Sequence, residues 1–504
     1  MEDSEIPKKI FWWTLFVLFW VVSATIIGYA FGYRFNFKRG VFVYGGSVSM
    51  KTTPLDSDIY INNVLYSSKK LNRLNNSYHI DGIQPGDYSL EVKSPGYATW
   101  SKKISIHSGI STEFWNVVLT KNEYIKTSYD TKGALRFFVS PRKNLTAVAL
   151  QNENDFAINV VNAQDKTVEN IFKSSDYVFT DNAKENIEWT PQAHRIIIPV
   201  IKKDTQKKNY LIADIPADQV LNLQDIAHTD DLSHVRWDPK TKNALFYMSG
   251  GNLYRVDLDS PTEIRQVAKN IASYELASSG LYYFQLPEGI VYKTNTDGTD
   301  DPSQITLSPP SHMDDPNYQI IVYDKNRIVF LNPSHDLYVY NQGESNDYFQ
   351  QLSSNALGSQ FSDDGKKLLY WNEHEINVYF ARKWDVQPMR NENDILPITR
   401  YSDVMSNIQW SRDYEHVIFS TSKQVKFIET DQRDHRNLMD LFKLNSDNNQ
   451  ITNNNSDGLI YFIDTNSDGA SMLNTIEFPE KTTLLENLGF GATAPTDTNA
   501  GKQK

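Results

Sequence analysis

The sequence contains no cysteine in 504 residues, which excludes disulfide frameworks, cysteine-ligated metal sites and thiol catalysis. Positive charge is also scarce, because 50 Lys and Arg stand against 62 Asp and Glu and give a formal net charge of −12. A generally basic surface for nucleic-acid phosphates is therefore not expected. Glycine and proline are modest at 23 and 20, whereas Phe, Tyr and Trp number 25, 28 and 10. This balance favours β-rich folding over disorder.

One long apolar segment interrupts this polar composition. Residues 10–33 form 24 consecutive positions without a charge, enough as a helix to cross a hydrocarbon core of about 30 Å. Trp12 and Trp13 stand near one end and Tyr29 and Tyr33 near the other, where interfacial aromatic residues are expected. A cleaved signal peptide has a shorter apolar run and a small-residue cleavage site. The sequence therefore predicts a transmembrane helix over 10–33, with the lipid bilayer as partner.

The charges beside this segment do not decide its orientation. Lys8 and Lys9 precede it, and Arg34, Lys38 and Arg39 follow it, so the two flanks carry nearly the same positive charge. We expect residues 1–9 to be a short cytoplasmic tail because of a resemblance in the segment that follows.

Residues 46–119 show the alternation of half-buried strands. Period-2 patterns occur at 47–50, 59–61, 88–92 and 104–106, and turn residues such as Gln84-Pro85-Gly86-Asp87 separate them. The pattern predicts a compact antiparallel β-sandwich of about 70 residues without a catalytic constellation.

This segment resembles the PEGA domain, a small β-sandwich of prokaryotic surface proteins. The resemblance is carried by Pro54, the Ile59–Asn63 strand and turn, Pro85-Gly86-Asp87-Tyr88, Gly96-Tyr97 and Trp100. It departs where the family takes its name, since that tetrapeptide reads Pro54-Leu55-Asp56-Ser57 here. The resemblance implies an extracytoplasmic accessory module. We therefore expect a single-pass protein of the cell membrane whose C-terminal domains are extracytoplasmic.

The remainder of the chain contains a repeat. An aromatic or aliphatic anchor and a polar turn precede an apolar run that starts seven residues after the anchor. The five clear anchors are Val139, Trp189, Trp237, Phe361 and Trp410, and weaker copies begin at Tyr274, Val322 and Ile451. Successive anchors are 37–50 residues apart, which is typical of four-stranded propeller blades.

The repeat predicts a β-propeller over 124–479 with eight blades, in which the aromatic anchors pack between neighbouring blades. Seven blades remain possible if a first and a last half-copy complete one blade, and an open stack of sheets is an alternative. Phe361-Ser362-Asp363-Asp364-Gly365-Lys366 and the Val291–Gly298 hairpin resemble the WD40-like propellers of the TolB type. Propellers have many unrelated activities, so the resemblance implies a fold and not a function. Residues 480–504 are expected to form a polar C-terminal tail.

Chemical motifs are mostly absent from the sequence, which has no GxxxxGK[ST], HExxH or GxSxG pattern. Asp464–Gly469 places oxygen side chains before a glycine, which fits either a calcium loop or a plain hairpin turn. Asn295–Asp301 has the same two interpretations. The Lys202, Lys203, Lys207 and Lys208 group is interpreted as a hairpin tip or a contact to anionic envelope polymer. We assign no catalytic, cofactor-binding or metal residue and expect no cofactor.

These observations predict an all-β, membrane-anchored extracytoplasmic binding or scaffold protein of the prokaryotic cell envelope. The propeller would bind an envelope or surface protein or a glycan, without nucleic acid and without enzymatic activity. The alternative is a propeller hydrolase or lyase that cleaves envelope polysaccharide or peptide, because carboxylates from several blades can meet without a recognisable spacing. A sensor that signals through a partner helix is a further alternative.

Overall fold

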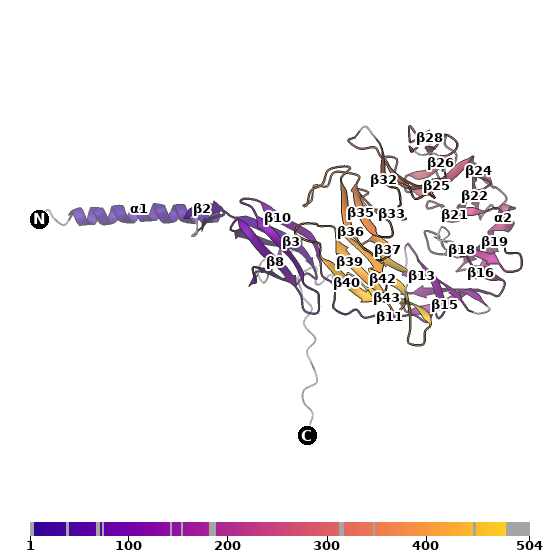
Figure 1. The fold of residues 1–504 in the computed structure, drawn as a ribbon, viewed down its shortest axis with the longest axis horizontal. Helices are drawn as coiled ribbons and strands as arrows, with labels where there is room; N and C mark the ends of the chain where they lie inside the picture. The colour runs from indigo at the N-terminus through magenta and orange to yellow at the C-terminus, as the bar shows by residue number, and fades with distance from the viewer. Residues whose placement is uncertain are drawn as a thin grey trace, which may run out of the picture. The chain divides into compact units, whose positions relative to one another are not determined.

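The computed structural model describes residues 5–36, 40–66, 71–72, 75–141, 144–152, 155–180, 188–311, 317–345, 348–446 and 450–479. It divides into two compact units, and strands dominate both (Figure 1). The first unit joins Met1–Glu123 with Asp431–Met439 and Pro479–Lys504, and the second joins Tyr124–Thr430 with Asp440–Phe478. The expected polar tail at 480–504 lies outside the described residues.

The first unit begins with helix α1 (Glu5–Ala30). Within it, Lys9–Ala30 has a mean hydropathy of 2.2 over its most apolar window and is long and apolar enough to cross a membrane. The predicted span reached residue 33, and this boundary is wrong. Gly32 adopts a φ of +93°, which ends the helix, and Tyr33 already belongs to a strand. That strand, β1 (Tyr33–Asn36), pairs antiparallel with β2 (Val41–Tyr44).

Two four-stranded sheets follow the hairpin and form the predicted sandwich. One sheet has the order β10-β3-β7-β6 and the other the order β5-β4-β8-β9. The strands are β3 (Gly46–Thr53), β4 (Asp58–Ile61), β5 (Val64–Leu65), β6 (Leu71–Asn72), β7 (Ser77–Ile83), β8 (Gly86–Lys93), β9 (Trp100–Ile106) and β10 (Ser111–Val118). One apolar core includes residues of both sheets, among them Met50, Ile59, Leu90, Trp100 and Phe114.

The expectation of a wholly antiparallel sandwich is wrong for one pair of strands. β10 lies parallel to β3, with Ser111 opposite Ser47. The chain leaves β9 in one sheet and enters β10 in the other, so β10 is not joined to its neighbour by a hairpin. A hairpin would force the antiparallel direction, whereas a crossover between sheets allows either direction.

Lys102 is buried within this first unit, on the same face of β9 as the buried residues Trp100 and Ile104. Its ammonium group donates to the backbone oxygens of Asp431 at 3.2 Å, Arg433 at 2.9 Å and His435 at 2.5 Å. These acceptors replace the water that a buried ammonium group loses. The segment Asp431–Met439 therefore supplies the hydrogen-bond acceptors that allow Lys102 to be buried at the sandwich core.

The second unit contains eight sheets among its described residues, seven with four strands and one with five. In chain order the strands are β11 (Thr127–Ser128), β12 (Ala134–Val139), β13 (Leu145–Gln151), β14 (Phe156–Asn162), β15 (Thr167–Ser174), β16 (Tyr177–Phe179), β17 (Glu188–Trp189), β18 (Arg195–Lys202), β19 (Lys208–Asp214), β20 (Gln219–Asn222), β21 (Ser233–Trp237), β22 (Ala244–Ser249), β23 (Asn252–Asp257), β24 (Arg265–Ala268), β25 (Ile271–Ala277), β26 (Gly280–Gln285) and β27 (Ile290–Thr294). They continue with β28 (Ser303–Gln304), β29 (Gln319–Asp324), β30 (Arg327–Leu331), β31 (Leu337–Asn341), β32 (Phe349–Ser353), β33 (Gly358–Phe361), β34 (Lys367–Trp371), β35 (Glu375–Phe380), β36 (Ile395–Arg400), β37 (Met405–Trp410), β38 (His416–Thr421), β39 (Gln424–Glu429), β40 (Leu438–Lys443), β41 (Ile451–Asn454), β42 (Leu459–Thr465) and β43 (Ser471–Glu477). A short helix, α2 (Leu223–Ala227), follows β20.

In most of these sheets consecutive strands are hydrogen-bonded neighbours and form an up-and-down meander, whereas in the five-stranded sheet β16 and β17 both pair with β18. The last sheet differs, because its order β11-β43-β42-β41 combines three C-terminal strands with one strand from the start of the unit. Thr127 of β11 lies opposite Thr475 of β43. This pairing joins the two ends of the repeat by backbone hydrogen bonds.

Apolar clusters join each sheet to the next. Separate clusters connect the sheets that begin with β12, β16, β21, β25, β29, β33 and β37, and another connects the β41–β43 sheet back to the β12–β15 sheet. The sheets that begin with β37 and β41 meet through Phe442 and Phe462, whose ring centroids are 4.5 Å apart. Eight sheets that contact one another in a closed cycle form a β-propeller. The open-stack alternative is therefore wrong.

Candidate functional site

The anchor tryptophans link the first strands of neighbouring sheets. Trp189, Trp237 and Trp410 are all buried. Their indole nitrogens donate to backbone oxygens of the preceding sheet: Trp189 to Phe138 at 2.9 Å, Trp237 to Glu188 at 3.0 Å and Trp410 to Gln360 at 3.0 Å. In each case the acceptor immediately precedes the anchor of its own sheet. The prediction that these anchors pack between blades is confirmed.

The residue before the anchor makes a second link between sheets. Glu188 accepts the backbone N–H of Trp237 at 2.8 Å, and Gln360 accepts that of Trp410 at 3.0 Å. Gln409 does the same for Asn453, at 2.7 Å. A polar side chain at this position thus has a structural role, because it satisfies a backbone group of the next first strand.

At two successive sheets this position carries a charge, and the two side chains meet a third charge, Glu275, which follows the anchor Tyr274. Arg236 of β21 donates through Nε to Glu188 of β17 at 2.6 Å and through Nη1 to Glu275 of β25 at 3.4 Å. We call Glu188, Arg236 and Glu275 the charged triad. Two carboxylates and one guanidinium give it a formal charge of −1. The side chains of Arg236, Glu188 and Glu275 are 40%, 25% and 21% exposed, so the triad is partly accessible to solvent.

The surroundings of the triad fix its ionisation. Burial raises the pKa of Glu188, although the positive charge and hydrogen bond of Arg236 act in the opposite direction. The Glu188 carboxylate raises the pKa of Arg236, which therefore stays a cation. Burial also raises the pKa of Tyr274 well above its ordinary value, and its hydroxyl donates to the backbone oxygen of His234. Tyr274 therefore stays protonated and uncharged beside the triad.

The guanidinium of Arg236 retains free donor capacity. Its Nε and Nη1 atoms donate hydrogen bonds to the two glutamates, and Nη2 has no hydrogen-bond partner among the described residues. An exposed guanidinium held by two carboxylates can donate to a carboxylate, hydroxyl or carbonyl oxygen of a ligand. The arrangement supports recognition of a polar group.

The sequence reasoning did not find the charged triad. Its three residues are 48 and 39 positions apart, so no local spacing connects them. A signal was nevertheless available, because Glu188 and Arg236 both stand directly before an anchor tryptophan. Aligning the repeats on their anchors would have placed these two opposite charges on neighbouring first strands.

The calcium interpretation of Asp464–Gly469 has a competing explanation in the hydrogen bonds. Asp464 accepts the backbone N–H of Asn445 at 2.8 Å, and its other oxygen faces Lys126. Asn466 accepts the N–H groups of Asp468 at 3.0 Å and Ala470 at 2.9 Å. Gly469 has a φ of +79° in the turn between β42 and β43. These contacts are those of a hairpin turn.

The other polar candidates also lie in turns. In Asn295–Asp301, the side chains of Asn295 and Asp297 both accept the N–H of Thr299 at 3.0 Å. In the lysine group, Lys202 pairs with Asp204 at 3.2 Å and Lys207 with Asp230 at 2.6 Å. Within the described ranges, no group of three or more His, Asp or Glu side chains is arranged to hold a metal ion.

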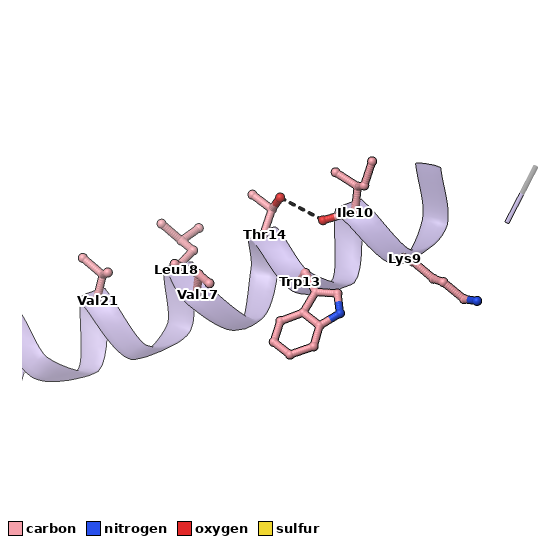
Figure 2. A pocket seen from close by; sticks show the side chains of 7 residues that line it. All are labelled: Lys9, Ile10, Trp13, Thr14, Val17, Leu18 and Val21. Carbon is pink, nitrogen blue, oxygen red and sulfur yellow. Dashed lines mark hydrogen bonds between the residues drawn. The ribbon is translucent and has the colours of Figure 1, made fainter. Parts of the chain in front are cut away.

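An apolar groove lies on one face of α1 (Figure 2). It is lined by Lys9, Ile10, Trp13, Thr14, Val17, Leu18 and Val21. The Thr14 hydroxyl donates to the backbone oxygen of Ile10 at 2.8 Å, and the Thr25 hydroxyl donates to that of Val21 at 2.8 Å. Both polar side chains are thus satisfied within the helix, as a hydrocarbon environment requires. The lining of the groove is apolar apart from Lys9 and Thr14.

Comparisons with solved structures find propellers of low similarity. The structure of the Dos1 propeller is 9% identical, with a TM-score of 0.46, and the match covers 70% of this chain and 95% of that one. The β-propeller domain of the Trilobed protease from Pyrococcus furiosus is 12% identical, with a TM-score of 0.37 and coverages of 64% and 98%. At such values the propeller assignment rests on the sheet order and the closed cycle of contacts described above.

A comparison with curated proteins finds no match. Among protein families, the PEGA domain matches residues 45–123, which include both sheets of the sandwich. This agrees with the resemblance over 46–119. The chain therefore contains a PEGA domain at residues 45–123, between an apolar N-terminal helix and a β-propeller.

Proposed function

We propose that this protein is a membrane-anchored binding or scaffold protein of the prokaryotic cell envelope, with its PEGA domain and propeller outside the cytoplasm. Three observations support the proposal: an apolar helix long enough to span a bilayer, a PEGA domain directly after it, and a large closed propeller. The PEGA match carries the most weight, because the charges flanking the helix leave its orientation open. In this proposal the propeller contacts an envelope protein or glycan.

The charged triad is the proposed recognition point. Arg236 donates a hydrogen bond to each of the two carboxylates. A general base, in contrast, needs a carboxylate oxygen that is free and suitably positioned to accept a proton. The same guanidinium keeps Nη2 available for an oxygen atom of a ligand. This combination favours binding of a polar group over bond cleavage, so we propose that the protein is not an enzyme.

Orientation is tested by labelling intact cells with a membrane-impermeant maleimide. The absence of native cysteine makes any introduced thiol unique. A cysteine at Leu307, which is 77% exposed, is expected to react in intact cells. A cysteine at Ser4, before the helix, is expected to react only after permeabilisation. The reversed pattern would place the propeller in the cytoplasm and overturn the proposal.

Binding is tested with isolated envelope polysaccharide and the full chain in lipid nanodiscs. We expect Arg236→Gln to weaken co-sedimentation with the polysaccharide, whereas Arg265→Gln should leave it unchanged. Arg265 is a suitable control because it is exposed and donates to the backbone oxygen of Gly298 instead of a carboxylate. Equal binding by both variants would remove the triad from the proposed site.

One observation favours the alternative of a polysaccharide- or peptide-cleaving propeller enzyme. Glu188 and Glu275 lie on either side of Arg236, and paired carboxylates are the usual groups of glycoside hydrolysis. The same polysaccharide preparation distinguishes the two functions. Release of new reducing ends by the wild type, abolished in Glu275→Gln, would establish the enzyme and reject the binding proposal.

A further inference from the structure

We propose that the β1–β2 hairpin is a second membrane contact, which inserts its aromatic face into the headgroup region of the bilayer. This inference rests on the membrane anchorage in the proposed function. We call Tyr33, Phe35, Phe42 and Tyr44 the aromatic face of the hairpin.

The strand register places these four side chains together. Tyr33 is paired with Tyr44 and Phe35 with Phe42, and side chains two residues apart in a strand point to the same side. The ring centroids are 5.3 Å apart in the first pair and 5.1 Å apart in the second. The hairpin therefore gathers four aromatic rings on one side.

The aromatic face remains partly exposed in the first unit, although the Tyr44 ring lies against Gly109. All four side chains are exposed, and Phe42 reaches 62%. Val41 and Ile110 are also exposed. A two-stranded hairpin that leaves four aromatic residues in water is marginally stable by itself and needs a partner surface.

The hairpin is continuous with the apolar helix. Only two residues separate Ala30 of α1 from Tyr33 of β1. Arg34 reaches back to donate to the backbone oxygen of Tyr29 at 2.8 Å, and its guanidinium lies 3.7 Å from the centre of the Tyr29 ring. These contacts fix the hairpin at the C-terminal end of the helix, where a spanning helix leaves the hydrocarbon.

The sandwich holds the other side of the hairpin. Gln84 donates to the backbone oxygen of Phe35 at 3.2 Å, and Ser108 donates to that of Tyr44 at 2.6 Å. Gly45 and Gly109 add a backbone hydrogen bond of 3.2 Å. The hairpin is therefore tied both to the helix end and to the PEGA domain.

An exposed face that contains two tyrosines suits the headgroup region in particular. Tyrosine presents an apolar ring and a polar hydroxyl, which is why it gathers at membrane–water interfaces. Arg34 lies on the opposite side of the same strand and adds a positive charge near the helix end.

The test uses single-cysteine variants carrying a nitroxide spin label, in the full chain reconstituted in vesicles of phosphatidylcholine and phosphatidylglycerol. Collision with oxygen, which concentrates in lipid, is compared with collision with a water-soluble nickel chelate. The labelled positions are Phe42, Val64 as the water-exposed control, and Leu18 as the control within the helix. Val64 is a matched control because it lies on β5 of the same unit and is 56% exposed.

We expect the Phe42 label to show a several-fold loss of nickel accessibility relative to the Val64 label, with oxygen accessibility retained. If the Phe42 label collides with nickel as freely as the Val64 label, the hairpin lies in water and the inference is wrong. Protection from both reagents would indicate a protein partner, such as a second copy of the chain, and would also overturn it. If the Leu18 label is accessible from the lipid in either case, the helix lies in the bilayer and the proposed membrane anchorage holds. A failure of the hairpin proposal can then be distinguished from a failure of the membrane anchorage.

Discussion

The interblade hydrogen bond of Trp410 can be removed by the substitution Trp410→Phe. Phenylalanine keeps an aromatic ring at the anchor position but loses the indole N–H, which donates to the backbone oxygen of Gln360 at 3.0 Å. Because Trp410 is only 2% exposed, no water replaces the lost donor. The substitution therefore separates the hydrogen bond from most of the packing of this anchor.

The expected loss of stability follows from the net contribution of a buried hydrogen bond to the free energy of unfolding. A bond of this kind contributes about 1 kcal/mol, and leaving a buried acceptor without a partner raises the loss to about 1–3 kcal/mol. The propeller contains about 350 residues. At about 2.1 cal/mol/K of unfolding entropy per residue, each kcal/mol shifts the Tm by about 1.4 °C. Trp410→Phe should therefore lower the Tm by about 1.5–4 °C.

Differential scanning calorimetry of the full chain measures this shift, with Trp371→Phe as the matched control. Trp371 packs against the same apolar cluster, and its indole nitrogen has no hydrogen-bond partner in the described part of the chain. The control therefore loses the same atoms without losing a bond. If both variants lower the Tm equally, ring size explains the effect and the interblade bond contributes nothing.

Three further predictions concern buried charged groups. Burial alone lowers the pKa of His416, but Asp413 at 2.6 Å outweighs it and leaves that pKa above its ordinary value. The stabilisation is complete below about pH 6.5 and is lost as the pH rises through the raised pKa, so the Tm should fall from pH 6 to 9 more in the wild type than in Asp413→Asn. Lys102→Met should speed amide exchange in Asp431–Met439 by about 30-fold, the equivalent of about 2 kcal/mol, because three carbonyl groups lose their donor. Burial lowers the pKa of Lys208 to about 8, so its acetylation rate should have a midpoint near that pH.

Each of these predictions has a result that contradicts it. Parallel pH profiles of the wild type and Asp413→Asn would show that the His416 pair does not titrate in this range. Lys103→Met is the control for Lys102, because the backbone nitrogen of Lys103 donates to Asp434 at 2.8 Å and this hydrogen bond survives the substitution. Equal exchange in both lysine variants would assign no role to the buried ammonium group. A midpoint of Lys208 near 10.5, the ordinary value of a lysine, would show that its burial is incomplete.

The second strands of the blades were the most predictable part of the fold. The run at 196–201 lies within β18, and the run at 417–419 lies within β38. These strands are flanked by a strand on each side and by a sheet on each face, so their central residues are buried and apolar. A short continuous apolar run is visible in the sequence because both faces of the strand centre are buried, although β38 also buries His416, Ser420 and Thr421.

Boundaries and directions were less predictable. The apolar composition of 10–33 continues past Ala30, but the φ of Gly32 ends the helix and turns the chain into the hairpin. The parallel direction of β10 depends on which sheet receives the strand after β9. Neither feature has a period or a composition that distinguishes it from its alternative.

The sequence by itself determined the membrane-spanning composition, the PEGA-like turns and the repeat of anchor and strand. These features are local, because hydropathy, turn residues and strand periodicity act over fewer than about 25 residues. The tertiary structure alone decided that β11 closes the ring with β43 and that Glu188, Arg236 and Glu275 meet. It also left four aromatic rings exposed on the hairpin beside the helix end. Such juxtapositions depend on the pairing and stacking of separate strands, which no local pattern records.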